Sequence, residues 1–344
     1  NENIFQAKVL KVVAEREKEF GASRGNTKEQ ELLAEVDFGD RKENRNILND
    51  FLPVKEGDRI FAQVPLYSQQ EPDEIAFVTD IFRSNGLIWL AAFFAILVWA
   101  VGGKKGLYSL VGLVFSFVVI FRFIIPQILA KADPVSTGIW GAVLILVVAI
   151  YVSYGFNRKS FSALIGIIIT LVFVGLLANL AIGSLHFSGF GGEESVYLNS
   201  QMRGALNLVG ILIAGIIIAA LGVLDDIAVT QASAVFSLAS VSNELRGLNL
   251  IKKAMEVGKD HISAVINTLV LAYTGAALPL LLLLTVNDFP VGFVVNGEII
   301  AEEIVRTLVS TSSLVLAVPI TTVIAAFFVP KNLAKQQAIE PHAH

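Results

Sequence analysis

Asp225 and Asp226 are the side chains of this sequence whose type and setting point most clearly to chemistry. They are the only charged residues between Arg203 and Glu244, and they follow a largely apolar stretch, 205–224. A helix of about 20 residues crosses a hydrocarbon core of roughly 30 Å. Because ionisable groups in or beside a membrane helix are costly, they usually face a bundle interior or a water-filled cavity on the route of an ion or proton. The pair therefore predicts a cation- or proton-binding site, and the alternative is that it marks the end of a membrane span.

Polar side chains follow the acidic pair within one to two helical turns. Residues 227–241 stay apolar or weakly polar, so the segment does not read as one that leaves the membrane at the aspartates. Thr230 and Gln231 stand at i+4 and i+5 from Asp226, on or near one helix face. Ser233 follows two residues later. We expect these side chains either to line a polar path with the aspartates or to pack and hydrogen-bond against neighbouring helices.

The apolar segment 261–286 carries further polar side chains near its start. Asn267 is an amide inside an apolar helix and needs hydrogen-bond partners, which either the aspartate pair or another helix could supply. Thr268 stands beside it. His261 opens the segment, and we expect it either at the membrane interface or in a pH-sensing role.

The last apolar segment, 304–329, is unusually rich in hydroxyl groups, among them Thr311 and Ser312. Pro319 follows in the same segment. Hydroxyl groups can satisfy the backbone groups that a proline frees in a membrane helix. We expect this packing role, and a discontinuous helix at a transport site is the alternative.

The composition is that of a polytopic membrane protein with a soluble part. The 344 residues are 54% hydrophobic and only 16% charged, whereas soluble domains carry about 25% charged residues. The absence of cysteine excludes disulfides, thiol catalysis and thiolate metal sites. The formal net charge of -4 and the lack of a basic run give no indication of nucleic-acid binding.

Residues 1–83 are predicted to form a small, mostly β, barrel-like domain. Apolar residues alternate with polar ones in short segments, which we expect to form five strands, at 4–13, 31–38, 46–51, 58–66 and 74–81. Residues 21–26 read as a loop. Glu15, Glu17 and Glu19 are interpreted as a solvated face, because the domain shows neither metal-ligand spacing nor a nucleophile–base arrangement.

Residues 84–331 are predicted to form a helical membrane bundle with seven spans. The expected spans are 87–101, 107–126, 138–154, 161–183, 205–224 or somewhat beyond, 261–286 and 304–329. Residue 1 is not methionine, and we expect a signal or an anchor helix before it. An anchor helix would make eight spans.

Basic residues gather in alternate loops, and this predicts the orientation of the chain. The loops that hold Lys104, Arg158, Arg246 and Lys331 are rich in lysine and arginine, so the positive-inside rule assigns them to the cytoplasm. The N-terminal domain is then extracytoplasmic. Residues 332–344 form a cytoplasmic tail.

Two resemblances refine this interpretation. The run Gly222-Val-Leu-Asp225-Asp226, within residues 210–285, resembles the Asp-bearing helix of the RND and SecD/SecF superfamily of proton-driven membrane proteins. There the matching acids carry protons. The chain as a whole resembles the YibE/F-like family through the run Leu224-Asp225-Asp226-Ile-Ala-Val-Thr230-Gln231-Ala-Ser233-Ala-Val and its arrangement of domain and spans. That resemblance implies a bacterial multi-pass protein of the cytoplasmic membrane and implies no particular biochemistry.

The leading functional hypothesis is a secondary transporter or exporter coupled to a cation or proton through Asp225 and Asp226. The alternative is a non-transporting receptor or assembly factor whose extracytoplasmic domain binds a partner. No catalytic motif stands out, so we expect no enzyme, no cofactor and no metal site. The expected partners are the lipid bilayer, a small solute or ion, and either further copies of the chain or a second membrane subunit.

Overall fold

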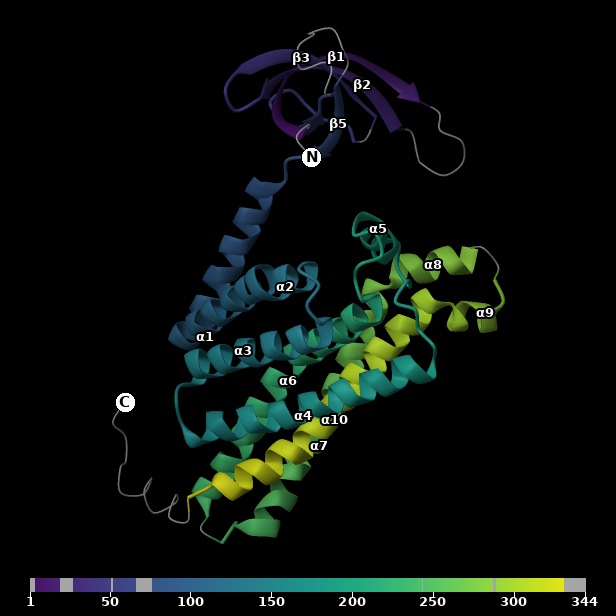
Figure 1. Cartoon of the computed structure of the whole chain (residues 1–344). Coiled ribbons are helices and arrows are strands. Elements are labelled where there is room, and N and C mark those ends of the chain that lie inside the picture. The colour runs from purple at the N-terminus through teal and green to yellow at the C-terminus, as the bar shows by residue number, and fades with distance from the viewer. Residues whose placement is uncertain are drawn as a thin grey trace. The chain divides into compact units, whose positions relative to one another are not determined.

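The computed structural model describes residues 4–18, 27–50, 52–65, 76–242, 244–286 and 289–330. The chain divides into two compact units, Asn1–Leu97 and Val98–His344. The first contains a small β-barrel and the second a bundle of helices (Figure 1). Each unit has its own cluster of buried apolar side chains. The predicted loop 21–26, Glu19 and the predicted tail 332–344 lie outside the described residues.

Five strands close into a barrel in the order β1-β2-β3-β5-β4, which confirms the predicted barrel. The strands are β1 (Ile4–Lys18), β2 (Thr27–Asp37), β3 (Lys42–Asn49), β4 (Arg59–Gln63) and β5 (Ala76–Ile81). All the pairings are antiparallel except that of β3 with β5. Alternate side chains of the strands point inward, and Leu32, Ala34, Val36, Ile47 and Ile60 are fully buried.

A buried amide network closes one part of the barrel. Gln30 is 2% exposed, and its Oε1 accepts hydrogen bonds from the Val54 amide at 2.8 Å and from Nδ2 of Asn49 at 2.9 Å. Its Nε2 donates to the Val54 carbonyl at 3.1 Å. Buried polar groups are costly unless they are paired. Gln30 is therefore a structural residue that ties β2 to β3 and to the chain before β4.

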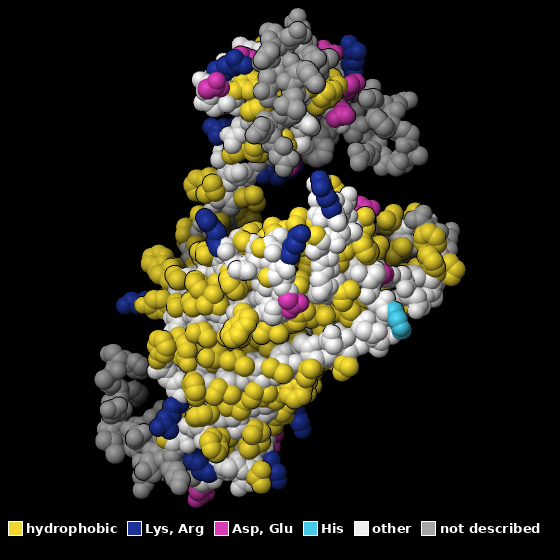
Figure 2. Space-filling view, in the orientation of Figure 1, with side chains coloured by type: hydrophobic (Ala, Val, Ile, Leu, Met, Phe, Trp, Pro, Cys, Tyr) yellow, Lys and Arg dark blue, Asp and Glu magenta, His cyan; other side chains and the backbone are white. Residues whose placement is uncertain are grey.

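The helices of the bundle are α1 (Ser84–Val119), the π-helical turn η2 (Ile120–Ile124), α2 (Ile125–Leu129), α3 (Pro134–Tyr154), α4 (Arg158–Ser184), α5 (Glu193–Gln201), α6 (Leu208–Val241), α7 (Gly247–Ala276), α8 (Leu278–Val286), α9 (Val291–Asn296) and α10 (Glu298–Phe328). The core lies around α6, which packs against α3, α4, α7 and α10. Hydrophobic side chains cover much of the bundle face in Figure 2, and charged side chains are few on it. This distribution fits a membrane protein.

The number of long apolar helices is lower than the seven spans predicted. Among the described residues, five helices are long and apolar enough to cross a membrane, or six if α7 and α8, bent by 58°, form one span. The predicted spans 87–101 and 107–126 belong to one helical stretch, Ser84–Leu129. The stretch is broken at Gly103, whose φ of 55° and ψ of -141° are not helical. Gly106 then lies so close to the Val98 carbonyl that a Cβ would overlap it.

Helix α6 runs to Val241, so it continues beyond residue 224, as the weakly polar segment 227–241 allowed. Asn207 caps its N-terminus, where Oδ1 accepts a hydrogen bond from the Gly210 amide at 2.9 Å. Beyond its C-terminus, the Arg246 guanidinium donates to the Ala239 carbonyl at 2.8 Å. The helix continues without interruption through the acidic pair. Asp225 and Asp226 therefore stand at the midpoint of one long helix.

Candidate functional site

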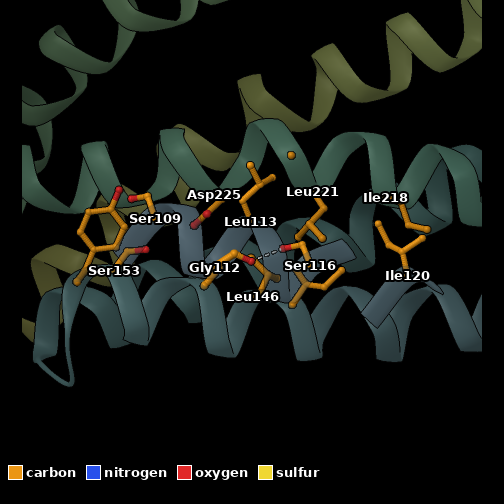
Figure 3. Close-up of a pocket in the computed structure, with 14 residues that line it drawn as sticks. Ser109, Gly112, Leu113, Ser116, Ile120, Leu146, Ser153, Ile218, Leu221 and Asp225 are labelled. Carbon is orange, nitrogen blue, oxygen red and sulfur yellow. Dashed lines mark hydrogen bonds between the residues drawn. The ribbon is translucent and has the colours of Figure 1, made fainter. Parts of the chain in front are cut away.

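A cavity of about 320 Å³ lies between the second half of α1, α3 and α6 (Figure 3). Helix α6 contributes residues at helical spacing, so that Ile218, Leu221, Gly222 and Asp225 share one face. The lining residues of the other two helices also recur at helical spacing. They are Ser109, Gly112, Leu113, Ser116 and Ile120 from the first stretch, and Ile145, Leu146, Ala149, Ser153 and Tyr154 from α3.

Small side chains allow α1 and α3 to approach beside the cavity. A Cβ on Gly112 would lie 3.5 Å from Cα of Ala149, so the two backbones are close at this level. Ser116 donates a hydrogen bond to the Gly112 carbonyl at 2.9 Å, within its own helix. The Ser116 hydroxyl is therefore already paired.

The cavity has a polar end and an apolar end. In Figure 3, Asp225, Ser109 and Ser153 lie together at one end, and Ile120 and Ile218 lie at the other. Ser109 is exposed, so the polar end of the cavity lies at the surface of the bundle. Tyr154 also lines the cavity and lies close enough to Asp225 to interact with it electrostatically.

The Asp225 carboxylate is incompletely paired. Its Oδ1 is buried and has no hydrogen-bond partner among the residues that the structure describes. Leaving a buried carboxylate oxygen unpaired costs free energy. A cation or a proton would relieve that cost, so this carboxylate is the group in the cavity best suited to bind one.

The two aspartates face different surroundings, although the sequence suggested one shared site. Asp226 is exposed and is absent from the cavity lining. Successive residues of an α-helix point about 100° apart, because each turn has 3.6 residues. The helix therefore turns Asp225 into the cavity and Asp226 away from it.

Gln231 belongs to a separate junction of three helices. It is 1% exposed, and its Nε2 donates to the Ala254 carbonyl of α7 at 3.0 Å and to Oγ1 of Thr322 of α10 at 2.7 Å. Its neighbour Thr230 is exposed. Ser233 donates to the Val229 carbonyl of its own helix at 2.7 Å. These three residues thus lie outside the cavity lining.

The remaining residues proposed from sequence are not brought to the aspartates. Asn267 and Thr268 are exposed on α7, and Thr268 donates to the Ala264 carbonyl of its own helix at 3.1 Å. Within the described ranges, the structure records no hydrogen bond from Asn267 to either aspartate. His261 is half-buried on the same helix.

The hydroxyl-rich part of α10 lies apart from the cavity as well. Thr311 and Ser312 are half-buried. Oγ1 of Thr311 is buried without a partner in the described part of the chain. Neither residue lines the cavity around Asp225.

Sequence reasoning missed the hydroxyl residues that accompany Asp225. Ser109 and Ser116 are seven residues apart in an apolar helix, which places them on one face. Ser153 and Tyr154 are adjacent at the end of α3. The i, i+7 serine spacing was the available signal, but it does not say which helix this face meets.

A second cluster that the sequence did not reveal lies at the start of α10. The Glu298 carboxylate accepts hydrogen bonds from the Ser188 amide at 2.6 Å, from its hydroxyl at 2.8 Å and from the Gly189 amide at 2.9 Å. Glu302, one turn later, is 9% exposed, and a Cβ on Gly191 would overlap its carboxyl group. The glycine-rich loop before α5 thus packs closely against two acidic side chains of α10.

No group of three or more histidine, aspartate or glutamate residues in the described ranges could hold a metal ion. The cavity offers one carboxylate and several hydroxyl groups. Hard divalent cations such as Ca²⁺ take six to eight oxygen ligands, usually including several carboxylates. The arrangement suits a single positive charge better than a divalent metal ion.

Comparison with known proteins gives one match. A family model described as YibE/F-like protein matches residues 90–331, which include the cavity, α6 and α10. The comparisons with curated proteins and with solved structures gave no match.

Proposed function

This chain belongs to the YibE/F-like family, and from that premise we propose that it is a secondary transporter of the bacterial cell membrane in which Asp225 binds the coupling cation or proton. The single observation that carries the proposal is the buried, unpaired Oδ1 of Asp225 beside a cavity in the helical bundle. Ionisable groups inside a membrane bundle are costly, and those that occur there usually mark the route of an ion or proton.

In this mechanism Asp225 alternates between an ionised state and a state that holds a cation or proton. The cavity admits the coupling ion to the carboxylate, and Ser109 and Ser153 supply hydroxyl oxygens near it. A change in the state of Asp225 can alter the packing of other helices, because α6 packs against α3, α4, α7 and α10. The helices lie in the bilayer, with the N-terminal barrel outside the cytoplasm and the C-terminus inside. No enzymatic step and no cofactor take part.

The acidic neighbours provide a matched pair of variants for the test. The full-length protein is placed in liposomes that enclose a pH-sensitive dye, and proton movement is followed after a gradient of sodium or potassium chloride is imposed. Asp225→Asn is expected to abolish the movement that the wild type shows, whereas Asp226→Asn is expected to retain most of it. Circular dichroism and thermal unfolding confirm that both variants fold. Unchanged proton movement in folded Asp225→Asn protein would refute the role of Asp225.

The rival function is that of a membrane receptor or assembly factor whose N-terminal domain binds a partner. The observation that favours it is the closed barrel, which has a hydrophobic core of its own. Here Asp225 would act only in helix packing. Asp225→Asn would then lower the unfolding temperature of a protein that moves no ions, and deletion of residues 1–83 would remove a crosslinked partner.

A further inference from the structure

We infer that the cavity beside Asp225 binds an organic monocation with an apolar body, such as an alkylammonium ion, as the transported solute. This inference rests on the proposed function and adds a substrate class to it. It follows from the charge, the size and the chemistry of the cavity walls.

The charge of the cavity lining favours a ligand with a single positive charge. In the part of the chain that the structure describes, Asp225 is the one ionisable acid or base among the residues that line the cavity, apart from the weakly acidic Tyr154. The carboxylate repels anions, and no lysine, arginine or histidine of the lining offsets it. A ligand with one positive charge therefore pairs with the unpaired oxygen of Asp225.

The size of the cavity exceeds what a bare ion needs. Its volume of about 320 Å³ is roughly ten times the ~30 Å³ that a water molecule occupies in the liquid. Pockets that hold small organic molecules begin at about 300 Å³. The end away from Asp225 is apolar, with Ile120, Leu221 and Ile218 in its wall (Figure 3). A hydrated metal ion buries no apolar surface against such a wall, whereas alkyl groups do, and this burial favours binding.

The polar end offers the groups that bind a substituted ammonium. Tyr154 supplies an aromatic ring to the cavity lining. Aromatic faces attract ammonium cations, and quaternary ammonium ligands are often bound in this way. The hydroxyl groups of Ser109 and Ser153 lie at the same end and can accept N–H donors of a primary or secondary amine.

Gly222 gives a way to change the size of the cavity without changing its charge. It lines the cavity, and a Cβ added to it would meet no atom within 4 Å. Gly215 lies on the same helix with equally open space and is not part of the lining. Gly222→Leu therefore narrows the cavity, and Gly215→Leu is its matched control.

The test measures binding of tetraethylammonium chloride to the purified full-length protein by isothermal titration calorimetry, with sodium chloride as the bare-cation comparison. Wild-type protein is expected to bind tetraethylammonium at least about tenfold more tightly than sodium. Because Asp225→Asn removes the charge partner, its affinity should fall at least about tenfold, whereas Asp226→Asn should stay within about twofold of wild type. Gly222→Leu should weaken binding of tetraethylammonium, and Gly215→Leu should leave it unchanged.

The outcomes separate this inference from the proposed function. Equal affinity of wild type and folded Asp225→Asn for tetraethylammonium, or no binding by the wild type, would overturn the inference. If proton movement in liposomes still depends on Asp225 in that case, the transporter stands and only its substrate class is wrong. If tetraethylammonium binds through Asp225 in a protein that moves no ions, the cavity is the ligand site of a receptor, and the transporter fails.

Discussion

Gln231 of α6 donates a 2.7 Å hydrogen bond from Nε2 to Oγ1 of Thr322 in α10, and the same amide group donates to the Ala254 carbonyl of α7. One side chain thus joins three helices. The Thr322 hydroxyl donates in turn to the Val318 carbonyl at 2.7 Å. The junction is fully paired on the donor side, unlike the carboxylate of Asp225, so we assign it a structural role.

Replacement of Gln231 tests that role. Gln231→Ala removes two buried hydrogen bonds and leaves a small void, which should cost roughly 2–3 kcal/mol of unfolding free energy. Thr230→Ala, at the exposed neighbour, should cost less than about 0.5 kcal/mol. Thermal unfolding in detergent gives the comparison. Equal stability of the two variants would show that the junction contributes nothing.

Close packing of α4 against α10 leads to a second prediction. A Cβ on Gly166 would overlap Oγ1 of Thr321, whereas a Cβ on Gly183 of the same helix would meet no atom within 4 Å. Gly166→Ala should therefore lower the unfolding free energy by about 1–3 kcal/mol through overpacking. Gly183→Ala should be neutral or slightly stabilising, because alanine favours the helix. A stabilised Gly166→Ala variant would contradict the packing described here.

The loop before α5 should become more mobile when its acidic partner is removed. Glu298→Ala removes the acceptor for three donor groups, which are the amide and the hydroxyl of Ser188 and the amide of Gly189. Amide hydrogen exchange in residues 188–191 should then accelerate by about tenfold, which corresponds to roughly 1.4 kcal/mol. Glu303→Ala is the control, since Glu303 pairs with Arg306 instead. Exchange that stays slow in Glu298→Ala would show that the hydrogen bonds do not hold the loop.

The amide network in the barrel gives a prediction for the other unit. Gln30→Ala should leave the buried Val54 amide without its side-chain partner and should destabilise the barrel by roughly 2–3 kcal/mol. Gln6→Ala, at an exposed position on β1, should have little effect. Hydrogen exchange of the β2 and β3 amides in the full-length chain reports the difference. Similar exchange rates in the two variants would show that Gln30 does not stabilise the barrel.

Sequence patterns predicted the elements of this protein better than their contacts. The barrel was predictable because alternating residues such as Ile60 and Ala62 show which face of a strand is buried. The bundle helices are apolar on nearly all sides, so their sequences do not show which face meets which neighbour. That is why Asp226 and Asn267, here exposed, could not be separated from Asp225. The predicted boundary between the segments 87–101 and 107–126 agrees with the break at Gly103, whose backbone is not helical.

The most direct test of the central claim asks whether water reaches the cavity beside Asp225 inside an apolar bundle. The chain has no cysteine, so Gly222→Cys and Gly215→Cys each create a unique thiol on α6 where space is open. Membrane vesicles of both orientations are treated with a charged, membrane-impermeant thiol reagent, and labelling rates are compared. We expect the thiol of Gly222→Cys to react from one side of the membrane and that of Gly215→Cys, on the same helix but outside the cavity, to react far more slowly. Equal resistance of both positions from both sides would contradict a water-filled cavity at Asp225.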